Sequence, residues 1–162
     1  MELKFQVQTR ILKPVAEVFD AVYNPEKLSG YFTNGGAKGT LDEGATVEWA
    51  FADTPGETVG PFPVMVKSSV KNELIVFEWQ SRTDGGNTLV EIRFETDGDN
   101  ATIVRISESG WDESSEDDQK RSYGNCMGWS QMVSALKAYT EYGINLRKGA
   151  YEGLYSKKDH QK

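Results

Sequence analysis

The chain has 162 residues, which suits one domain with an ordinary hydrophobic core and leaves no room for two. Its net charge of −7 would repel a phosphate backbone or an anionic lipid surface, so we expect no nucleic-acid partner. No apolar run approaches the roughly 18 residues of a membrane span, and the N-terminal residues lack the apolar core of a signal peptide, so we expect a cytoplasmic protein without membrane insertion.

The N-terminal quarter predicts a strand followed by two short helices. Apolar and polar residues alternate over residues 3–9, and this period of two is typical of a half-buried strand. Proline at the start and apolar residues on one side predict a helix over residues 14–22, which Asn24-Pro25 should end. A second short helix is expected over residues 25–28.

The middle of the chain predicts an antiparallel sheet. Turn signals occur at Gly35-Gly36, 42–44, 84–86 and 97–100. The strands expected between them cover residues 46–52, 62–70, 74–80, 88–96 and 101–109. The last three alternate regularly, which favours a sheet with one face buried and the other facing water.

One long helix is predicted at the C-terminal end. An acidic loop over residues 112–118 supplies serine and carboxylate groups that can cap the first turn of this helix. A stripe at three- and four-residue spacing marks the side that should pack on the sheet, and it comprises Cys126, Trp129, Met132, Leu136, Tyr139 and Gly143. We expect a single domain over residues 1–146 and a polar, flexible tail over residues 147–162.

This order of elements predicts an α+β fold in which a curved antiparallel sheet of about six to seven strands wraps around the long C-terminal helix. The two short helices after the first strand should close one end. A strongly curved sheet cannot be filled everywhere by one helix, so we expect a cavity between the sheet and the helix.

The same order carries a family resemblance. The helix over 14–22, the short helix over 25–28 followed by Tyr31-Phe32, the strands over 74–79 and 102–110, and the terminal helix with Gly128-Trp129 resemble the START-like (SRPBCC, birch-pollen-allergen-like) helix-grip superfamily. Within it, the chain is most similar to the group named after the activator of the heat-shock protein 90 ATPase. The resemblance extends to about residue 145.

The resemblance implies a cavity for lipids, polyketides or other hydrophobic molecules, as in some members, or contact with a chaperone, as in others. Two positions depart from the common pattern. Members often have tryptophan where this chain has Tyr31, and many have histidine or another polar residue where it has Glu108.

Nucleophilic and metal chemistry lack the side chains that they need. His160 is the only histidine, so no Ser-His-Asp or Cys-His unit has a positioned base. Cys126, the single cysteine, is best interpreted as a small buried hydrophobic residue rather than a reactive thiol. We expect no metal site and no cofactor, because the chain has no second cysteine and no partner for His160.

Glu108 is the most informative single residue. Alternation places it on the same inward side as Val104 and Ile106, where a bare charge would be costly. The interpretation we favour is that its carboxylate reaches solvent at the cavity mouth. The alternatives are that it anchors the polar group of a ligand, or that it acts as a general acid or base in a cyclase- or dehydratase-like reaction.

The leading hypothesis is a non-enzymatic domain that binds a small hydrophobic or amphipathic ligand between sheet and helix. The candidate ligand contacts are Phe77, Trp79, Phe94, Ile106, Glu108, Trp129, Met132, Leu136 and Tyr139. Ordinary core packing is the rival explanation for the aromatic members. Gly124 and Gly128 inside the helix indicate either a close approach or a gap, with chance as the competing explanation.

Two other functions are open. A stress-related co-chaperone would activate a chaperone ATPase through its outer surface, with the acidic loop as a candidate contact, although such loops are more often solvated caps. An enzyme of the cyclase or dehydratase kind would depend on Glu108.

Overall fold

The computed structural model describes residues 1–154, and its elements follow the predicted order. β1 (Phe5–Ile11) is followed by α1 (Val15–Tyr23) and α2 (Pro25–Leu28). The remaining elements are β2 (Gly36–Lys38), β3 (Thr46–Phe51), β4 (Val59–Val70), β5 (Leu74–Gln80), β6 (Asn87–Thr96), β7 (Thr102–Ser109) and α3 (Glu116–Tyr142).

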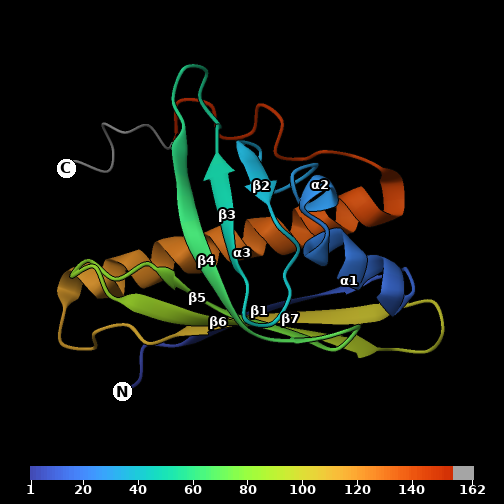
Figure 1. The fold of residues 1–162 in the computed structure, drawn as a ribbon, viewed down its shortest axis with the longest axis horizontal. Coiled ribbons are helices and arrows are strands. Elements are labelled where there is room, and N and C mark those ends of the chain that lie inside the picture. The colour runs from blue at the N-terminus through green and yellow to red at the C-terminus, as the bar shows by residue number, and fades with distance from the viewer. Residues whose placement is uncertain (155–162) are drawn as a thin grey trace.

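All seven strands belong to one antiparallel sheet with the order β1-β7-β6-β5-β4-β3-β2. The sheet bends so that β3 and β4 rise beside α3 while β5, β6, β7 and β1 lie beneath it (Figure 1). Helices α1 and α2 lie together at one end of this arrangement. The predicted α+β helix-grip fold is therefore confirmed.

A single asparagine separates the two short helices. Asn24 ends α1 in an extended conformation, and its side chain then accepts a hydrogen bond from the backbone N–H of Glu26 to cap α2. Pro25 occupies the first position of α2, where the missing N–H leaves no hydrogen bond unmade. The sequence prediction of a stop at Asn24-Pro25 is confirmed.

Capping residues also fix both ends of the 27-residue helix α3. The Ser115 side chain accepts from the backbone N–H of Asp118 at the start, as the serine-rich acidic loop predicts. Gly143 adopts a left-handed conformation with φ of 67° at the end, which glycine reaches without the penalty of a Cβ atom.

The short strand β2 was not predicted, because Gly35-Gly36 was interpreted only as a turn. Gly36 pairs with Ala50 of β3, so the ladder begins within the expected turn. A Cβ atom on Gly35 would lie 2.7 Å from the backbone carbon of Ala50, which explains why glycine is needed there. Three residues are too few for a periodic pattern to appear in the sequence.

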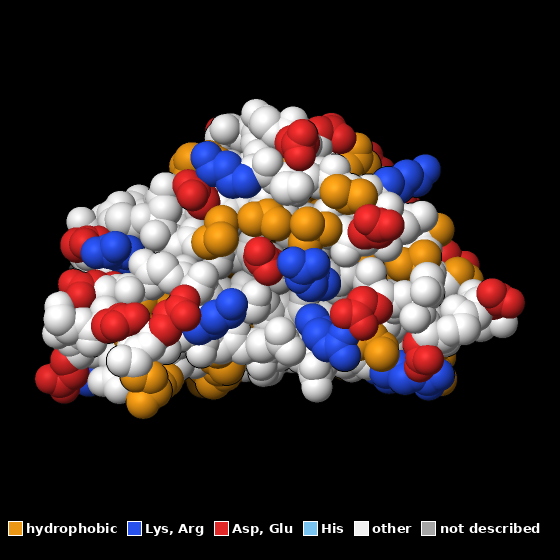
Figure 2. All heavy atoms as spheres, turned by 90° about the horizontal axis from the view of Figure 1, so that it is seen from below, with side chains coloured by type: hydrophobic (Ala, Val, Ile, Leu, Met, Phe, Trp, Pro, Cys, Tyr) orange, Lys and Arg blue, Asp and Glu red, His pale blue; other side chains and the backbone are white. Residues whose placement is uncertain are grey.

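The buried core lies between the concave face of the sheet and α3, with α1 and α2 over one end. Figure 2 shows the outer side of the sheet, away from α3, where acidic, basic and hydrophobic side chains are interspersed. Arg105 pairs with Glu95 there, and Arg93 lies 3.6 Å from Glu91. Within residues 1–154, none of the helices combines the length and the apolar character that crossing a membrane requires.

Candidate functional site

Glu108 lies at the junction of the sheet and the first half of α3. It follows Val104 and Ile106 on the inward side of β7, as the alternation predicts, and its relative exposure is 0%. The interpretation that its carboxylate reaches solvent is therefore wrong. The reason is that α3 covers this end of β7 with polar side chains as well as apolar ones.

Four neutral side chains donate hydrogen bonds to this carboxylate. Oε2 accepts from the indole Nε1 of Trp79 at 2.9 Å and from the hydroxyl of Thr88 at 2.5 Å. Oε1 accepts from the indole Nε1 of Trp129 at 3.0 Å and from the amide nitrogen of Asn125 at 3.1 Å. The indole and amide N–H groups can only donate, so the site is matched to an ionised carboxylate.

The network joins three strands to the long helix. Trp79 comes from β5, Thr88 from β6 and Glu108 from β7, while Asn125 and Trp129 lie one turn apart on α3. The amide of Asn125 also donates to the Ser81 hydroxyl at 2.7 Å. Because both tryptophan rings are held by the same carboxylate, Glu108 fixes the orientation of two aromatic walls at once.

Two adjoining grooves open above this network, between the ends of β3–β5 and α3. We name them the strand-side groove, of about 390 Å³, and the helix-side groove, of about 360 Å³. Both are lined by Phe51, Trp79, Asn125 and Arg147. Volumes in this range are typical of sites for small organic molecules.

The two grooves differ in their remaining side chains. The strand-side groove adds Phe62 and Val59 together with the carboxylates of Asp53 and Glu57. The helix-side groove is also lined by Phe32, Arg121, Gly124, Met127, Gly128, Trp129 and Gln131. Among residues 1–154, the strand-side lining has two carboxylates and the helix-side lining has none.

Arg147 crosses the boundary between the grooves from the segment that follows α3. Its Nε and Nη2 atoms donate to the two oxygens of Asp53, each at 2.8 Å, in a bidentate ion pair. Its guanidinium lies 4.7 Å from the ring centre of Phe51 and 5.8 Å from that of Phe32. This contact holds the C-terminal segment across the tip of β3, as the red trace in Figure 1 shows.

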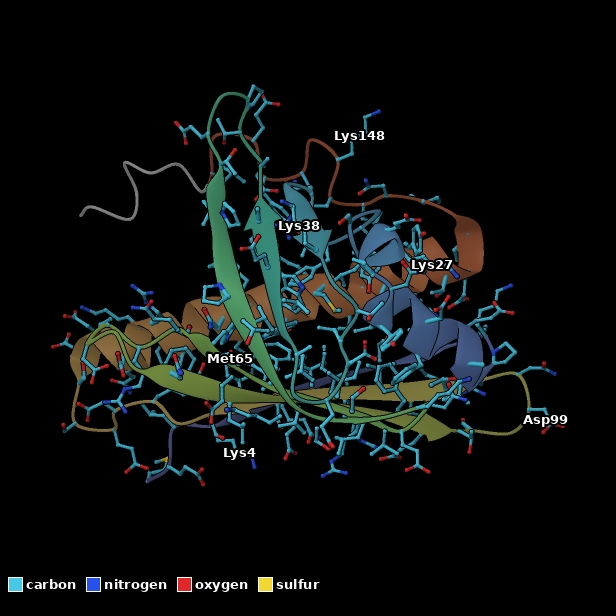
Figure 3. All side chains as sticks on the ribbon, in the orientation of Figure 1. Lys4, Lys27, Lys38, Met65, Asp99 and Lys148 are labelled. Atoms are coloured by element: carbon cyan, nitrogen blue, oxygen red, sulfur yellow. The ribbon has the colours of Figure 1, made fainter. Side chains whose placement is uncertain are left out.

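Other contacts hold the same segment. The backbone N–H of Gly153 donates to the Thr54 hydroxyl at 2.9 Å. Figure 3 shows Lys148 on this segment, above the ends of β2 and β3 and pointing away from the body of the protein. The flexible tail predicted over residues 147–162 stays a prediction, and its part from 155 onward, with His160, lies outside the described residues.

The helical glycines leave open space. A Cβ atom at Gly124 or Gly128 would meet nothing within 4 Å, so neither glycine is required by a close approach. Both line the helix-side groove. Of the two structural explanations drawn from the sequence, the gap is therefore the one observed.

The predicted ligand contacts separate into three groups. Trp79 and Trp129 line the grooves, and Glu108 lies directly beneath them. The others that are buried belong to the continuous core and line neither groove: Phe77, Phe94, Ile106, Met132 and Leu136. Tyr139 packs at the other end of α3, where its ring centre lies 5.1 Å from that of Tyr31.

Several groove residues were not among the candidates. Asn125 could have been found, because a polar side chain one turn before Trp129 on the inward side of a helix needs a buried partner. Phe51 lies in the strand predicted over residues 46–52 and was not among the candidate ligand contacts. Asp53, Arg121 and Arg147 had no local signal, since their place depends on contacts between distant segments.

The acidic loop before α3 is partly buried. Asp118 has a relative exposure of 1% and accepts from the backbone and hydroxyl of Thr83 and from the backbone N–H of Asp112. Burial alone would raise the pKa of Asp118, but the hydrogen bonds from Thr83 and Asp112 outweigh it and lower that pKa. Asp118, at the C-terminal end of the acidic loop, therefore holds this loop against the β5–β6 turn.

Cys126 is only partly buried, so its interpretation as a core residue holds in part. Within residues 1–154, no group of three or more His, Cys, Asp or Glu side chains is arranged to hold a metal ion.

Comparison with solved structures shows the same fold in several bacterial proteins. Protein SSP2350 from Staphylococcus saprophyticus has 24% identity and a TM-score of 0.71, over 90% of this chain and 96% of that one. The solution structure of the Aha1 dimer from Colwellia psychrerythraea has 19% identity and a TM-score of 0.69, over 88% of this chain and 98% of that one.

DynU16, a putative protein of the dynemicin biosynthetic locus, has 19% identity and a TM-score of 0.73. The match covers 92% of this chain but 51% of DynU16. None of the curated proteins matches the chain. The family model described as activator of Hsp90 ATPase homolog 1-like protein matches residues 13–141. The chain therefore belongs to the family of activator of Hsp90 ATPase homolog 1-like proteins, as its sequence resemblance predicted.

Proposed function

We propose that this protein binds a small hydrophobic or amphipathic molecule in the two adjoining grooves between the ends of β3–β5 and α3. The observation that carries the proposal is the pair of grooves, of about 390 and 360 Å³, that share Phe51, Trp79, Asn125 and Arg147. Aromatic walls with a few fixed polar groups are typical of sites for organic ligands.

The tryptophans give such a site a rigid shape. Trp79 and Trp129 have ring centres 5.4 Å apart, and Glu108 fixes both indole nitrogens by hydrogen bonds. A ligand that packs against these rings therefore orders few side chains on binding, which reduces the entropic cost of association. In this proposal Glu108 is a positioning residue, because its four donors leave the carboxylate buried beneath the rings.

The site differs from the cavity that the sequence suggested. Phe94 and Leu136 mark the middle of the sheet–helix interface, and both are buried in the core. The proposed binding site lies instead at the end of the interface where α3 begins. The co-chaperone and cyclase hypotheses stay predictions, the first from the family resemblance and the second from the presence of Glu108.

The test is a titration with N-phenylnaphthylamine, a neutral apolar probe, followed by the indole N–H resonances of the tryptophans. The resonances of Trp79 and Trp129 should shift saturably, while that of Trp111, which lies outside both grooves, should not. Gly128→Leu should abolish the shifts by filling the helix-side groove. Ser130→Leu, at an exposed position of α3 outside both linings, should leave them unchanged.

Shifts that do not saturate would contradict binding in these grooves. Shifts that survive Gly128→Leu unchanged would contradict binding in the helix-side groove.

A further inference from the structure

Among the described residues, the charged side chains that line the helix-side groove are both positive. They are Arg121 and Arg147, and the carboxylate that is paired with this lining is that of Asp53, which binds Arg147 from the strand-side groove. A positive lining is unusual for a chain whose net charge is −7, since an anion approaching most other surfaces would be repelled.

Arg121 is free to meet a ligand. It lies on the exposed side of α3, and among the described residues its guanidinium makes no ion pair. Along α3 it is followed at three- and four-residue spacing by Gly124 and Gly128. Residues at this spacing lie on one side of a helix. The guanidinium of Arg121 therefore lies beside the helix surface that Gly124 and Gly128 leave uncovered.

Arg147 supplies a second cation, which is already paired with Asp53. The guanidinium has five N–H donors, and two of its nitrogen atoms already donate to Asp53. The remaining donors can bind an anion without breaking the ion pair. Its face lies over Phe51, so the aromatic wall and the cation are held together.

Glycines and aromatic rings both belong to the lining of the helix-side groove. Gly124 and Gly128 leave part of the α3 surface without side chains, and the rings of Phe32 and Trp129, whose centres lie 5.4 Å apart, line the same groove. A planar ring suits a lining of this kind better than a branched aliphatic chain does, because stacking on an aromatic side chain uses the whole face of the ring.

We propose that the ligand of the helix-side groove is a planar aromatic anion, such as an aromatic carboxylate or sulfonate. Its ring lies over Gly124 and Gly128 against Trp129, and its acidic group meets Arg121 and the free donors of Arg147. This inference rests on the proposed function and adds the chemical class of the ligand to it.

The experiment compares two probes that share one ring system and differ by a single anionic group. Anilinonaphthalene sulfonate carries the acidic group, and N-phenylnaphthylamine is the same ring system without it. Each is titrated by fluorescence into the wild type, Arg121→Gln and Lys120→Gln. Lys120 is a matched control, because it is the neighbouring exposed cation on α3 and lines neither groove.

Arg121→Gln should weaken binding of the sulfonate about threefold to fivefold, the range expected for one exposed ion pair, and should change the affinity of the neutral probe by a clearly smaller factor. Lys120→Gln should change neither affinity by a comparable factor. Added salt should weaken only the sulfonate, because it screens the arginines.

The inference is overturned if Arg121→Gln changes both probes equally or neither of them, or if only the neutral probe binds. In those cases saturable binding of the neutral probe still supports the proposed function. If neither probe binds, the proposed function fails as well.

Discussion

The indole Nε1 of Trp129 on α3 donates to Oε1 of Glu108 on β7 at 3.0 Å, and both side chains are buried. This hydrogen bond joins the long helix to the sheet beneath the proposed binding grooves. It also gives a buried carboxylate one of the four donors that compensate for its lost hydration.

The first prediction concerns this carboxylate. Glu108→Gln replaces one acceptor oxygen by an NH₂ group, which at either position faces an indole N–H that cannot accept from it. The free energy of unfolding should fall by about 1–3 kcal/mol, as expected for buried donors left unsatisfied. Urea denaturation followed by circular dichroism measures it. Glu91→Gln, on the outer face of β6, is the control and should have little effect.

A stable Glu108→Gln protein would contradict the positioning role. It would agree instead with the hypothesis of a catalytic residue, whose replacement should abolish turnover and leave folding intact.

The second prediction concerns the glycines of α3. Gly124→Ala adds a Cβ atom that meets nothing within 4 Å, so the gain in helix propensity should stabilise the protein by about 0.5–1 kcal/mol. Gly143→Ala should do the opposite, because that glycine has a φ of 67°. Thermal denaturation compares the two variants. Destabilisation by Gly124→Ala would show that this surface of α3 is covered.

Asp118 gives a pH-dependent prediction. Its pKa is lowered in the folded protein, so its contribution to stability is present above the unfolded value of about 3.9 and is lost as pH falls through the folded pKa. Asp118→Asn should therefore be less stable than the wild type at neutral pH, and the difference should shrink below about pH 4. Urea midpoints measured between neutral and acidic pH report it.

Asp117→Asn is the matched control for Asp118, since Asp117 lies next to it in the first turn of α3 and is exposed. If the difference between Asp118→Asn and the wild type stayed constant down to acidic pH, the hydrogen-bonded carboxylate would not be the cause.

The ion pair between Asp53 and Arg147 gives a prediction on affinity. Asp53→Asn keeps an oxygen that can accept from Arg147 and removes the charge that offsets the guanidinium. The sulfonate probe should then bind about twofold to fivefold more tightly, because the groove becomes more positive. Asp97→Asn, which removes the negative charge of an exposed pair with Arg10 at the other end of the sheet, should not change the affinity. Weaker binding in Asp53→Asn would show that the aspartate holds Arg147 in place.

The sequence predicted the fold well, because the relevant signals are local. Alternation over β5, β6 and β7 placed Ile106 and Glu108 on the concave face, and Asn24-Pro25 located the boundary between α1 and α2. β2 escaped prediction because it is only three residues long and occupies an expected turn.

The site was predicted less completely, because distant segments build it. The donors to Glu108 come from β5, β6 and α3, so the sequence indicated an inward carboxylate without showing that it would be covered. Arg147 and Asp53 lie 94 residues apart, and neither has a local pattern that points to the other. The apolar stripe that includes Met132 and Leu136 showed which side of α3 is buried. It could not distinguish residues of the core from residues that line a groove.

Intermolecular nuclear Overhauser effects from bound N-phenylnaphthylamine are the most direct measurement of where a ligand lies. The proposed site predicts contacts from the probe to the Hα protons of Gly124 and Gly128 and to the ring of Trp129. Contacts to Phe94 and Leu136 instead, or no contacts to the protein at all, would contradict binding at the groove where α3 begins.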